Sequence, residues 1–235
     1  MELVKEKWSK KDTQEFDKYL YSIRKEDKIE FTKKTVNTSM TTLGIPTPQL
    51  RAIAKEIIKG NYISFLDNMT NKYYETTIVC AILINKIDSI EEKEKYLKKL
   101  KIDNWATVDI LSFKIKGKEK DYINLSKKYI KSDKPFERRI GVRILFGYTD
   151  KEDVEEIFKI IDSLYDEEEY YVNMAVAWLM CELVIKNRDK TFEYLKNHNL
   201  NDFTINKAVS KCRDSFRVSK EDKDFLTKYR KKGKR

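Results

Sequence analysis

The sequence has few of the residues that break regular structure, with 6 glycines and 3 prolines among 235 residues. An all-β chain needs many tight turns and a disordered chain is rich in proline and glycine, so this scarcity argues against both classes. No stretch approaches the ~18 consecutive apolar residues of a membrane-spanning helix, and we expect no membrane contact. The start, MELVKEKWSKKD, contains no apolar segment, so we expect no secretory signal peptide.

Histidine and cysteine are also scarce. The single histidine, His198, leaves no credible zinc site, and we expect neither a metal nor another cofactor. The cysteines Cys80, Cys181 and Cys212 are odd in number, far apart in the sequence and set in apolar runs. They form no CxxC pair, so we expect small core residues of a reducing compartment, and we predict a bacterial cytosolic protein.

Charge, by contrast, is abundant, and basic residues exceed acidic ones. Lysine and arginine number 49 against 39 aspartates and glutamates, which gives a formal net charge of +10. A surplus of cations favours a polyanionic partner, above all nucleic acid. The alternative is the compositional bias of an AT-rich genome, which would scatter the lysines rather than cluster them. The runs Lys5–Lys11 and Lys93–Lys101 mix both signs and predict solvated faces.

Apolar residues recur at helical spacing along almost the whole chain, which predicts an all-α protein. We expect helices at 11–25, 28–36, 47–59, 61–68, 73–87, 90–99, 104–114, 118–131, 135–148, 150–163, 168–186, 189–196, 202–214 and 219–230. Asp103, Asp150, Asp202 and Ser219 stand where four of these helices begin and are predicted to be their N-caps.

From about residue 61 the helices pair at a period of roughly 35–40 residues, which is typical of HEAT-like repeats. The pairs cover 73–99, 104–131, 135–163, 168–196 and 202–230. Such pairs stack into a helical-repeat solenoid, which we expect to be curved with a concave basic groove. We predict one domain over 1–235, with an N-terminal helical cap at 1–60, paired-helix repeats at 61–230 and a basic tail at 231–235. A repeat array closes its core without a partner chain, so we expect a monomer.

Four residues in three segments combine two indoles, a carboxylate and a guanidinium. Trp105 and Asp109 are four residues apart, which places them on one face of a helix. Arg139 follows Trp105 by 34 residues and Trp178 follows Arg139 by 39, so each step is about one repeat. Residues one repeat apart take equivalent places in consecutive helix pairs, so all four can line the same surface.

This ordered set resembles the active site of the AlkD-type DNA glycosylases, which release alkylated bases. The resemblance is carried by the W-x-x-x-D motif at Trp105 and Asp109, by Arg139 and by Trp178. It extends over most of the chain and includes residues 43–48, LGIPTP, which resemble the family's L-G-I-x-T-P stretch. The resemblance implies HEAT-like repeats that grip duplex DNA. It implies a DNA-3-methyladenine/7-methylguanine glycosylase of base excision repair, which releases cationic N3- or N7-alkylated purines without flipping the base into a pocket.

By the same resemblance, Asp109 is the catalytic carboxylate, Trp105 and Trp178 pack on the sugar–phosphate of the lesion nucleotide, and Arg139 contacts the backbone nearby. The chemistry agrees with these roles. A cationic alkylpurine leaves without a general acid, so the site must stabilise the oxocarbenium-like deoxyribose. An ionised aspartate stabilises that cation and orients a water, while indole faces add cation–π attraction. An arginine holds a phosphate in bidentate fashion, and no metal is required.

Structural interpretations of these residues remain open. Trp105 and Trp178 lie in apolar helices, where a tryptophan is often a core residue. Asp109 and Arg139 also fit the Asp and Arg that tie one HEAT repeat to the next through buried hydrogen bonds. Two other functions follow: a non-catalytic DNA-binding module for damaged or branched DNA, or a protein-interaction scaffold. The N-terminal region departs most from the family.

A second candidate surface is basic. Lys207 and Lys211 are one turn apart and are followed by Arg213 and Arg217, which predicts a phosphate-binding stripe. A solvated face is the alternative. Trp8, in the charged N-terminal stretch, is expected to be a docking aromatic and receives no functional role.

Overall fold

The computed structural model describes residues 1–231 of the chain. Within this range there are fourteen α-helices and no β-strand, only an isolated bridge between Thr41 and Tyr73, so the all-α prediction is confirmed. The chain divides into two compact units, Met1–Ser112 and Phe113–Arg235. Among the described residues, no helix combines the length and apolar character that a bilayer crossing needs. Of the predicted basic tail, residues 232–235 lie outside the described part.

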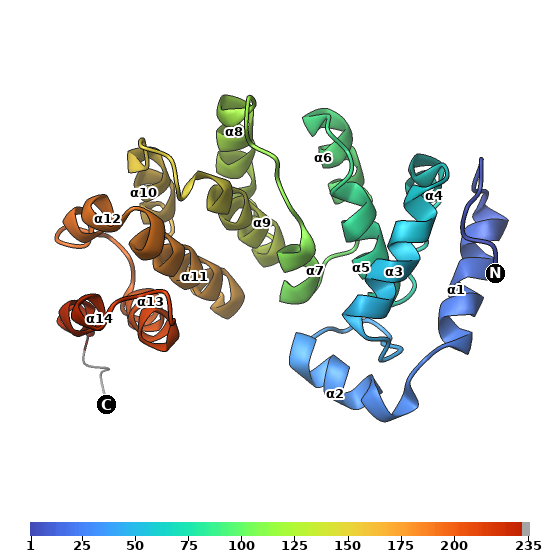
Figure 1. Ribbon diagram of the computed structural model, residues 1–235, viewed down its shortest axis with the longest axis horizontal. Coiled ribbons are helices and arrows are strands. Elements are labelled where there is room, and N and C mark those ends of the chain that lie inside the picture. The colour runs from blue at the N-terminus through green and yellow to red at the C-terminus, as the bar shows by residue number, and fades with distance from the viewer. Residues whose placement is uncertain (232–235) are drawn as a thin grey trace. The chain divides into compact units, whose positions relative to one another are not determined.

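The first unit is built around one buried helix. Its helices are α1 (Lys10–Ser22), α2 (Glu26–Val36), α3 (Thr47–Ile58), α4 (Tyr62–Asp67), α5 (Tyr74–Ile84), α6 (Ile90–Lys99) and α7 (Trp105–Ile110) (Figure 1). Nearly every side chain of α5 is buried, and α5 packs on α1, α3, α4, α6 and α7. A helix that is apolar on all sides is stable only in such a surrounded position.

Trp8 fixes the N-terminal segment to this unit. Its side chain is 0% exposed, and its ring meets Phe65 edge-on at 4.9 Å and Phe16 at 6.2 Å between ring centroids. The backbone N–H of Trp8 donates to the Ser64 hydroxyl, 2.9 Å away. The expected docking role is therefore confirmed, and Trp8 is a core residue.

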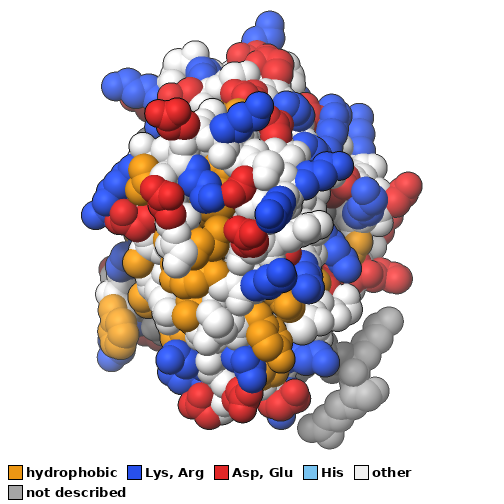
Figure 2. All heavy atoms as spheres, turned by 90° about the vertical axis from the view of Figure 1, so that its right-hand side faces the viewer, with side chains coloured by type: hydrophobic (Ala, Val, Ile, Leu, Met, Phe, Trp, Pro, Cys, Tyr) orange, Lys and Arg blue, Asp and Glu red, His pale blue; other side chains and the backbone are white. Residues whose placement is uncertain are grey.

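The outer side of the first unit mixes charges. Figure 2 shows the side on which α1 lies, where Lys and Arg side chains are interspersed with Asp and Glu around a central area of hydrophobic side chains. This agrees with the solvated face predicted for Lys5–Lys11, although Lys5 itself is half-buried and pairs with Asp12. The prediction for Lys93–Lys101 is wrong at its first residue. Lys93 is 1% exposed, and its ammonium donates to the Ser112 carbonyl at 3.2 Å.

A buried carboxylate holds the 43–48 segment in place. Glu75 on α5 is 0% exposed and accepts the backbone N–H of Leu43 with both oxygens, at 2.9 and 3.0 Å. Burial raises the pKa of Glu75, and N–H groups of Leu43, Ile45 and Gly44 oppose that rise. Gly44 has φ +68° and lies so close to α2 that an added Cβ would be 2.5 Å from the Lys25 carbonyl oxygen.

Gly44→Ala is expected to destabilise the protein by about 3 kcal/mol, because a left-handed alanine is strained and its methyl group meets backbone. Gly117→Ala is the matched control. Gly117 has φ +77°, but an added Cβ would have nothing within 4 Å, so that variant should lose only ~1 kcal/mol. Urea unfolding measures both losses. Equal losses would show that the close approach to α2 does not matter.

The second unit is a two-layer stack of helices. It contains α8 (Glu119–Ile130), α9 (Pro135–Leu145), a 3-10 turn (Phe146–Tyr148), α10 (Glu155–Asp162), α11 (Tyr170–Lys186), α12 (Arg188–Tyr194), α13 (Asp202–Asp214) and α14 (Lys220–Thr227). Helices α9, α11 and α13 pack in sequence as one layer, and α8, α10 and α12 form the other (Figure 1). This layering is the arrangement that the helical-repeat prediction requires. The predicted single domain and concave groove concern both units together and stay predictions.

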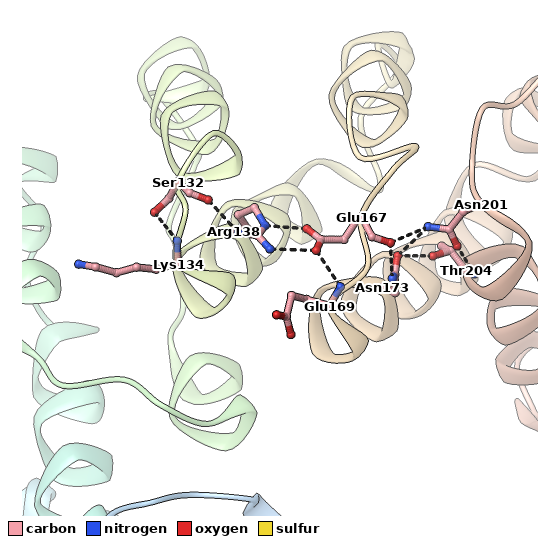
Figure 3. A network of polar contacts seen from close by, with 8 residues as sticks. All are labelled: Ser132, Lys134, Arg138, Glu167, Glu169, Asn173, Asn201 and Thr204. Carbon is pink, nitrogen blue, oxygen red and sulfur yellow. Dashed lines mark hydrogen bonds and ion pairs between the residues drawn. The ribbon is translucent and has the colours of Figure 1, made fainter.

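A polar network joins the N-terminal ends of α9, α11 and α13 (Figure 3). Arg138 on α9 binds both carboxylate oxygens of Glu167, at 2.6 and 2.9 Å. The Glu167 carbonyl accepts from the side-chain amides of Asn173 and Asn201, at 2.9 and 3.1 Å. Thr204 on α13 donates to the Asn173 side chain at 2.6 Å. These bonds fix the register of three consecutive helices of one layer.

Two of the predicted N-caps are displaced by one residue. Asn104, not Asp103, caps α7, and Asn201, not Asp202, caps α13. In each case the Asn side-chain oxygen accepts the N–H three residues on, which satisfies a donor that the helix leaves unpaired. Ser219 caps α14 as predicted, accepting from Asp222 at 3.1 Å.

The two predicted helices that are shortened most in the structure lose residues because side chains from elsewhere bind their backbone. Of the helix expected at 104–114, only α7 (Trp105–Ile110) forms, and of the helix expected at 150–163, only α10 (Glu155–Asp162) forms. Asn85 binds the backbone on both sides of Leu111 and ends α7 there. The Lys151 carbonyl accepts from the Asn187 amide at 2.6 Å, so residues before Val154 do not join α10 and Asp150 is not its N-cap.

Candidate functional site

The short helix α7 is held at both ends by asparagine side chains. At its start, the buried Asn104 accepts the backbone N–H of Thr107 at 2.9 Å. At its end, Asn85 donates to the Ile110 carbonyl at 2.9 Å and accepts the Ser112 N–H at 2.7 Å. A six-residue helix is not stable alone, so these bonds determine where it lies within the first unit.

Asp103 connects the start of α7 to the loop after α2. Its carboxylate accepts from the Thr38 hydroxyl at 2.6 Å and from the N–H and hydroxyl of Ser39 at 2.8 and 2.7 Å. Burial opposes ionisation of Asp103, but the hydrogen bonds from Ser39, Thr38 and Asn104 outweigh it and lower the pKa. Asp103 is therefore a structural carboxylate, tied to the loop that follows α2.

The outer face of α7 presents the first two candidate residues. Thr107 and Val108 point into the core, whereas Trp105 and Asp109 are half-buried and lie one turn apart. The indole N–H of Trp105 donates to the Thr35 carbonyl at 3.2 Å, which fixes the ring against the last turn of α2. The predicted juxtaposition of an indole and a carboxylate on one helical face is present, and neither residue is a buried core residue.

Arg139, the third candidate, lies inside the second unit. It is 5% exposed, and its Nη1 donates to the backbone carbonyl of Tyr171, in the first turn of α11. A buried guanidinium that binds the next helix pair agrees with the structural interpretation of this residue.

Trp178, the fourth candidate, is half-buried in the middle of α11. Its ring meets Phe146 at 4.5 Å between centroids with an interplanar angle of 60°. The Arg143 guanidinium carbon lies 4.9 Å from the Phe146 ring centroid and 5.6 Å from that of Trp178. The sequence interpretation missed Arg143 and Phe146. The available signal was spacing, because Arg143 is one helical turn after Arg139.

The predicted basic stripe is divided by the structure. Lys207 and Lys211 are partly exposed and one turn apart on α13, and Arg213 is exposed near its end. Arg217 lies beyond α13 and forms a two-point ion pair with Glu182 of α11, with Nη1 3.0 Å from Oε2. Arg217 therefore ties a loop to α11, and the phosphate-binding role predicted for Lys207, Lys211, Arg213 and Arg217 stays a prediction.

The cysteines are buried and free, as expected of core residues. Although Cys181 and Cys212 are far apart in the sequence, they interact between α11 and α13, and the neighbouring Cys181 together with burial raises the pKa of the Cys212 thiol. His198 accepts the Leu200 N–H at 3.1 Å through Nδ1. Among residues 1–231, no group of three or more His, Cys, Asp or Glu side chains is arranged to hold a metal ion.

The comparisons with known proteins show the family of the chain. A protein-family model described as DNA alkylation repair enzyme matches residues 16–212, which include Trp105, Asp109, Arg139 and Trp178. A search of the curated proteins gives no match. The matched region covers most of the chain and parts of both compact units. The chain belongs to the DNA alkylation repair enzyme family, which implies DNA as its partner.

Proposed function

We propose that the protein is a DNA glycosylase. It hydrolyses the N-glycosidic bond of cationic N3- or N7-alkylated purines in duplex DNA, without flipping the base into a pocket. Family membership supports the repair of alkylated DNA. The observation that carries the finer proposal is the partly exposed pair Trp105 and Asp109 on a helix whose two ends are both fixed. A fixed carboxylate needs no reorganisation when charge develops opposite it.

The reaction needs no acid to activate the leaving base. When the bond between C1′ and the purine nitrogen breaks, its electron pair neutralises the cationic base, and the positive charge moves to the deoxyribose. The Asp109 carboxylate stabilises that oxocarbenium-like sugar and orients a water. The water oxygen then bonds to C1′ and its proton passes to solvent, which leaves an abasic site and a free base.

The resemblance also gives the two indoles a role in the reaction. In the proposal Trp105 and Trp178 pack on the sugar–phosphate of the lesion nucleotide, and each contributes about 1 kcal/mol of cation–π attraction. Because the Trp105 N–H is bound to Thr35, this residue offers its ring rather than a hydrogen-bond donor. The resemblance also assigns Arg139 a backbone contact, but its burial and its bond to Tyr171 favour a structural role in this chain.

Lys207, Lys211 and Arg213 complete the proposed DNA surface by contacting phosphates, without a metal or other cofactor. One observation favours a second candidate function. Of the four residues that resemble the glycosylase site, Arg139 is buried and donates to the backbone carbonyl of Tyr171. A family member whose site is incomplete in this way would bind damaged or branched DNA without excising a base.

The proposal is tested by comparing a cationic base with a neutral one in otherwise identical duplexes. We expect release of free N7-methylguanine and no release of hypoxanthine, because the site supplies no general acid to a neutral leaving base. Mass spectrometry of the supernatant detects both, and protein-free samples correct for spontaneous depurination.

Each other outcome has a distinct meaning. Equal release of both bases would contradict the mechanism. Duplex binding that weakens steeply with salt, but with no base released, would establish the non-catalytic module. If the protein does not bind duplex DNA even at low salt, the remaining hypothesis is a protein-interaction scaffold.

A further inference from the structure

A single asparagine side chain holds the end of the described chain against α13. The amide nitrogen of Asn206 donates to the Lys231 carbonyl at 3.1 Å, and its amide oxygen accepts the Lys231 backbone N–H at 2.9 Å. Both polar backbone groups of Lys231 are therefore bound by one side chain, from a helix residue 25 positions earlier in the chain. We call this pair of hydrogen bonds the Asn206 clasp.

Two turns after α14 lead the chain to the clasp. The N–H of Tyr229 donates to the Leu226 carbonyl and that of Arg230 to the Thr227 carbonyl, both at 3.1 Å. A chain end is usually frayed unless it is tied to the rest of the fold. Because the bonds of the turns lie within the segment itself, the clasp is the contact that places Lys231 beside α13.

The clasp brings exposed cations to the middle of α13. Arg230 and Lys231 are exposed, and Lys207, which follows Asn206 on α13, is partly exposed. Among residues 1–231, none of these three cations forms an ion pair with a carboxylate. The local surplus of positive charge is therefore not neutralised by the described part of the chain.

Cations in this arrangement favour a polyanionic partner. Each lysine that neutralises a DNA phosphate releases counterions, which is the main source of affinity for a nucleic-acid backbone. A lysine whose backbone is already fixed loses less conformational freedom on binding than one at a frayed chain end. Asn206 carries no charge, yet its side chain determines where the charge of Lys231 lies.

We propose that Lys231 contacts a DNA phosphate next to the one that Lys207 binds, and that Asn206 is the positioning residue that holds Lys231 there. This inference rests on the proposed function, which places DNA phosphates along α13 at Lys207. It adds the segment after α14 to the DNA surface and gives an uncharged residue of α13 a part in DNA binding.

The test compares Lys231→Met, Asn206→Ala and the double variant. Lys228→Met is the matched control for charge, because Lys228 is exposed but its ammonium lies 3.4 Å from the centroid of the Phe225 ring. Ser210→Ala is the matched control for an uncharged change on α13, one turn after Asn206. Affinity for a short unmodified duplex is measured between about 50 and 200 mM salt, which requires no catalysis. Tm is measured on the same samples.

Lys231→Met should reduce the slope of log affinity against log salt by about 1, the value for one phosphate contact. Asn206→Ala should reduce the slope by the same amount although it removes no charge, because Lys231 is then no longer held. The double variant should match either single variant, since both act through one contact. Lys228→Met and Ser210→Ala should keep the wild-type slope, and no variant should change Tm by more than about 2 °C.

Three results would overturn the inference. The first is a wild-type slope in Lys231→Met, and the second is an equally reduced slope in Lys228→Met. The third is a wild-type slope in Asn206→Ala, which would show that Lys231 does not need the clasp. If Asn206→Ala does not fold, Asn206→Gln decides by the same readout, because one added methylene displaces the amide but keeps its polarity. Failure of the wild type to bind duplex would instead overturn the proposed function, and this inference with it.

Discussion

Asp109→Asn is expected to slow release of N7-methylguanine by about 100- to 1000-fold, the usual cost of removing one preorganised electrostatic group from an active site. The amide has nearly the shape of the carboxylate, but it is neutral and does not stabilise the positive charge on the sugar. Binding of unmodified duplex should stay within about twofold of the wild type, since Asp109 makes no attractive contact with phosphate. Single-turnover release rates and duplex affinity are the two measurements.

Asp103→Asn is the matched control, because it removes a carboxylate six residues away that binds Ser39 and Thr38. It should lower the midpoint of urea unfolding, while the folded fraction still releases base at the wild-type rate. Asp109→Asn could instead destabilise the protein while the fraction that stays folded releases base at the wild-type rate. Asp109 would then have the structural role of connecting one repeat to the next through hydrogen bonds.

Glu75→Ala is expected to cause a large loss of stability, about 4 kcal/mol, which exceeds the loss expected for Gly44→Ala. The side chain is fully buried and accepts the Leu43 N–H with both oxygens, and the nearby N–H groups of Gly44 and Ile45 also act to lower the pKa of its carboxyl group. Each buried donor left without an acceptor costs roughly 1–3 kcal/mol. Urea unfolding, followed by far-UV circular dichroism, measures the loss.

Glu75→Gln separates the hydrogen bonds from the charge. It keeps one acceptor oxygen at nearly the same volume, so about half of the loss should be recovered. If Glu75→Ala lowers the free energy of unfolding by less than about 1 kcal/mol, its effect is no larger than that of an average point substitution. It would mean that Glu75 does not hold the loop between α2 and α3.

The helices could be predicted from the sequence because their apolar periodicity is local and glycine and proline are rare. Their ends could not always be predicted, because side chains distant in the sequence decide them. Asn85 ends α7 by binding the backbone around Leu111, and Asn187 takes the carbonyl of Lys151 before α10 begins. The sequences of residues 104–114 and 150–163 do not themselves predict these hydrogen bonds.

The candidate site was predictable to the same extent. The spacing of Trp105 and Asp109 placed them on one face of α7, because that relation depends on a single helix. The burial of Arg139 depends on how α11 packs on α9, and the ion pair of Arg217 depends on Glu182 of another helix. Spacing and residue type contain no information about such contacts between helices.

The most direct test of the proposed glycosylase activity is a time course of free-base release from duplex DNA that contains N7-methylguanine, with the protein in excess over DNA. We expect free N7-methylguanine to accumulate well above the protein-free rate, with abasic sites formed in equal amount. Release at the protein-free rate, by protein shown to be folded and bound to the duplex, would contradict it.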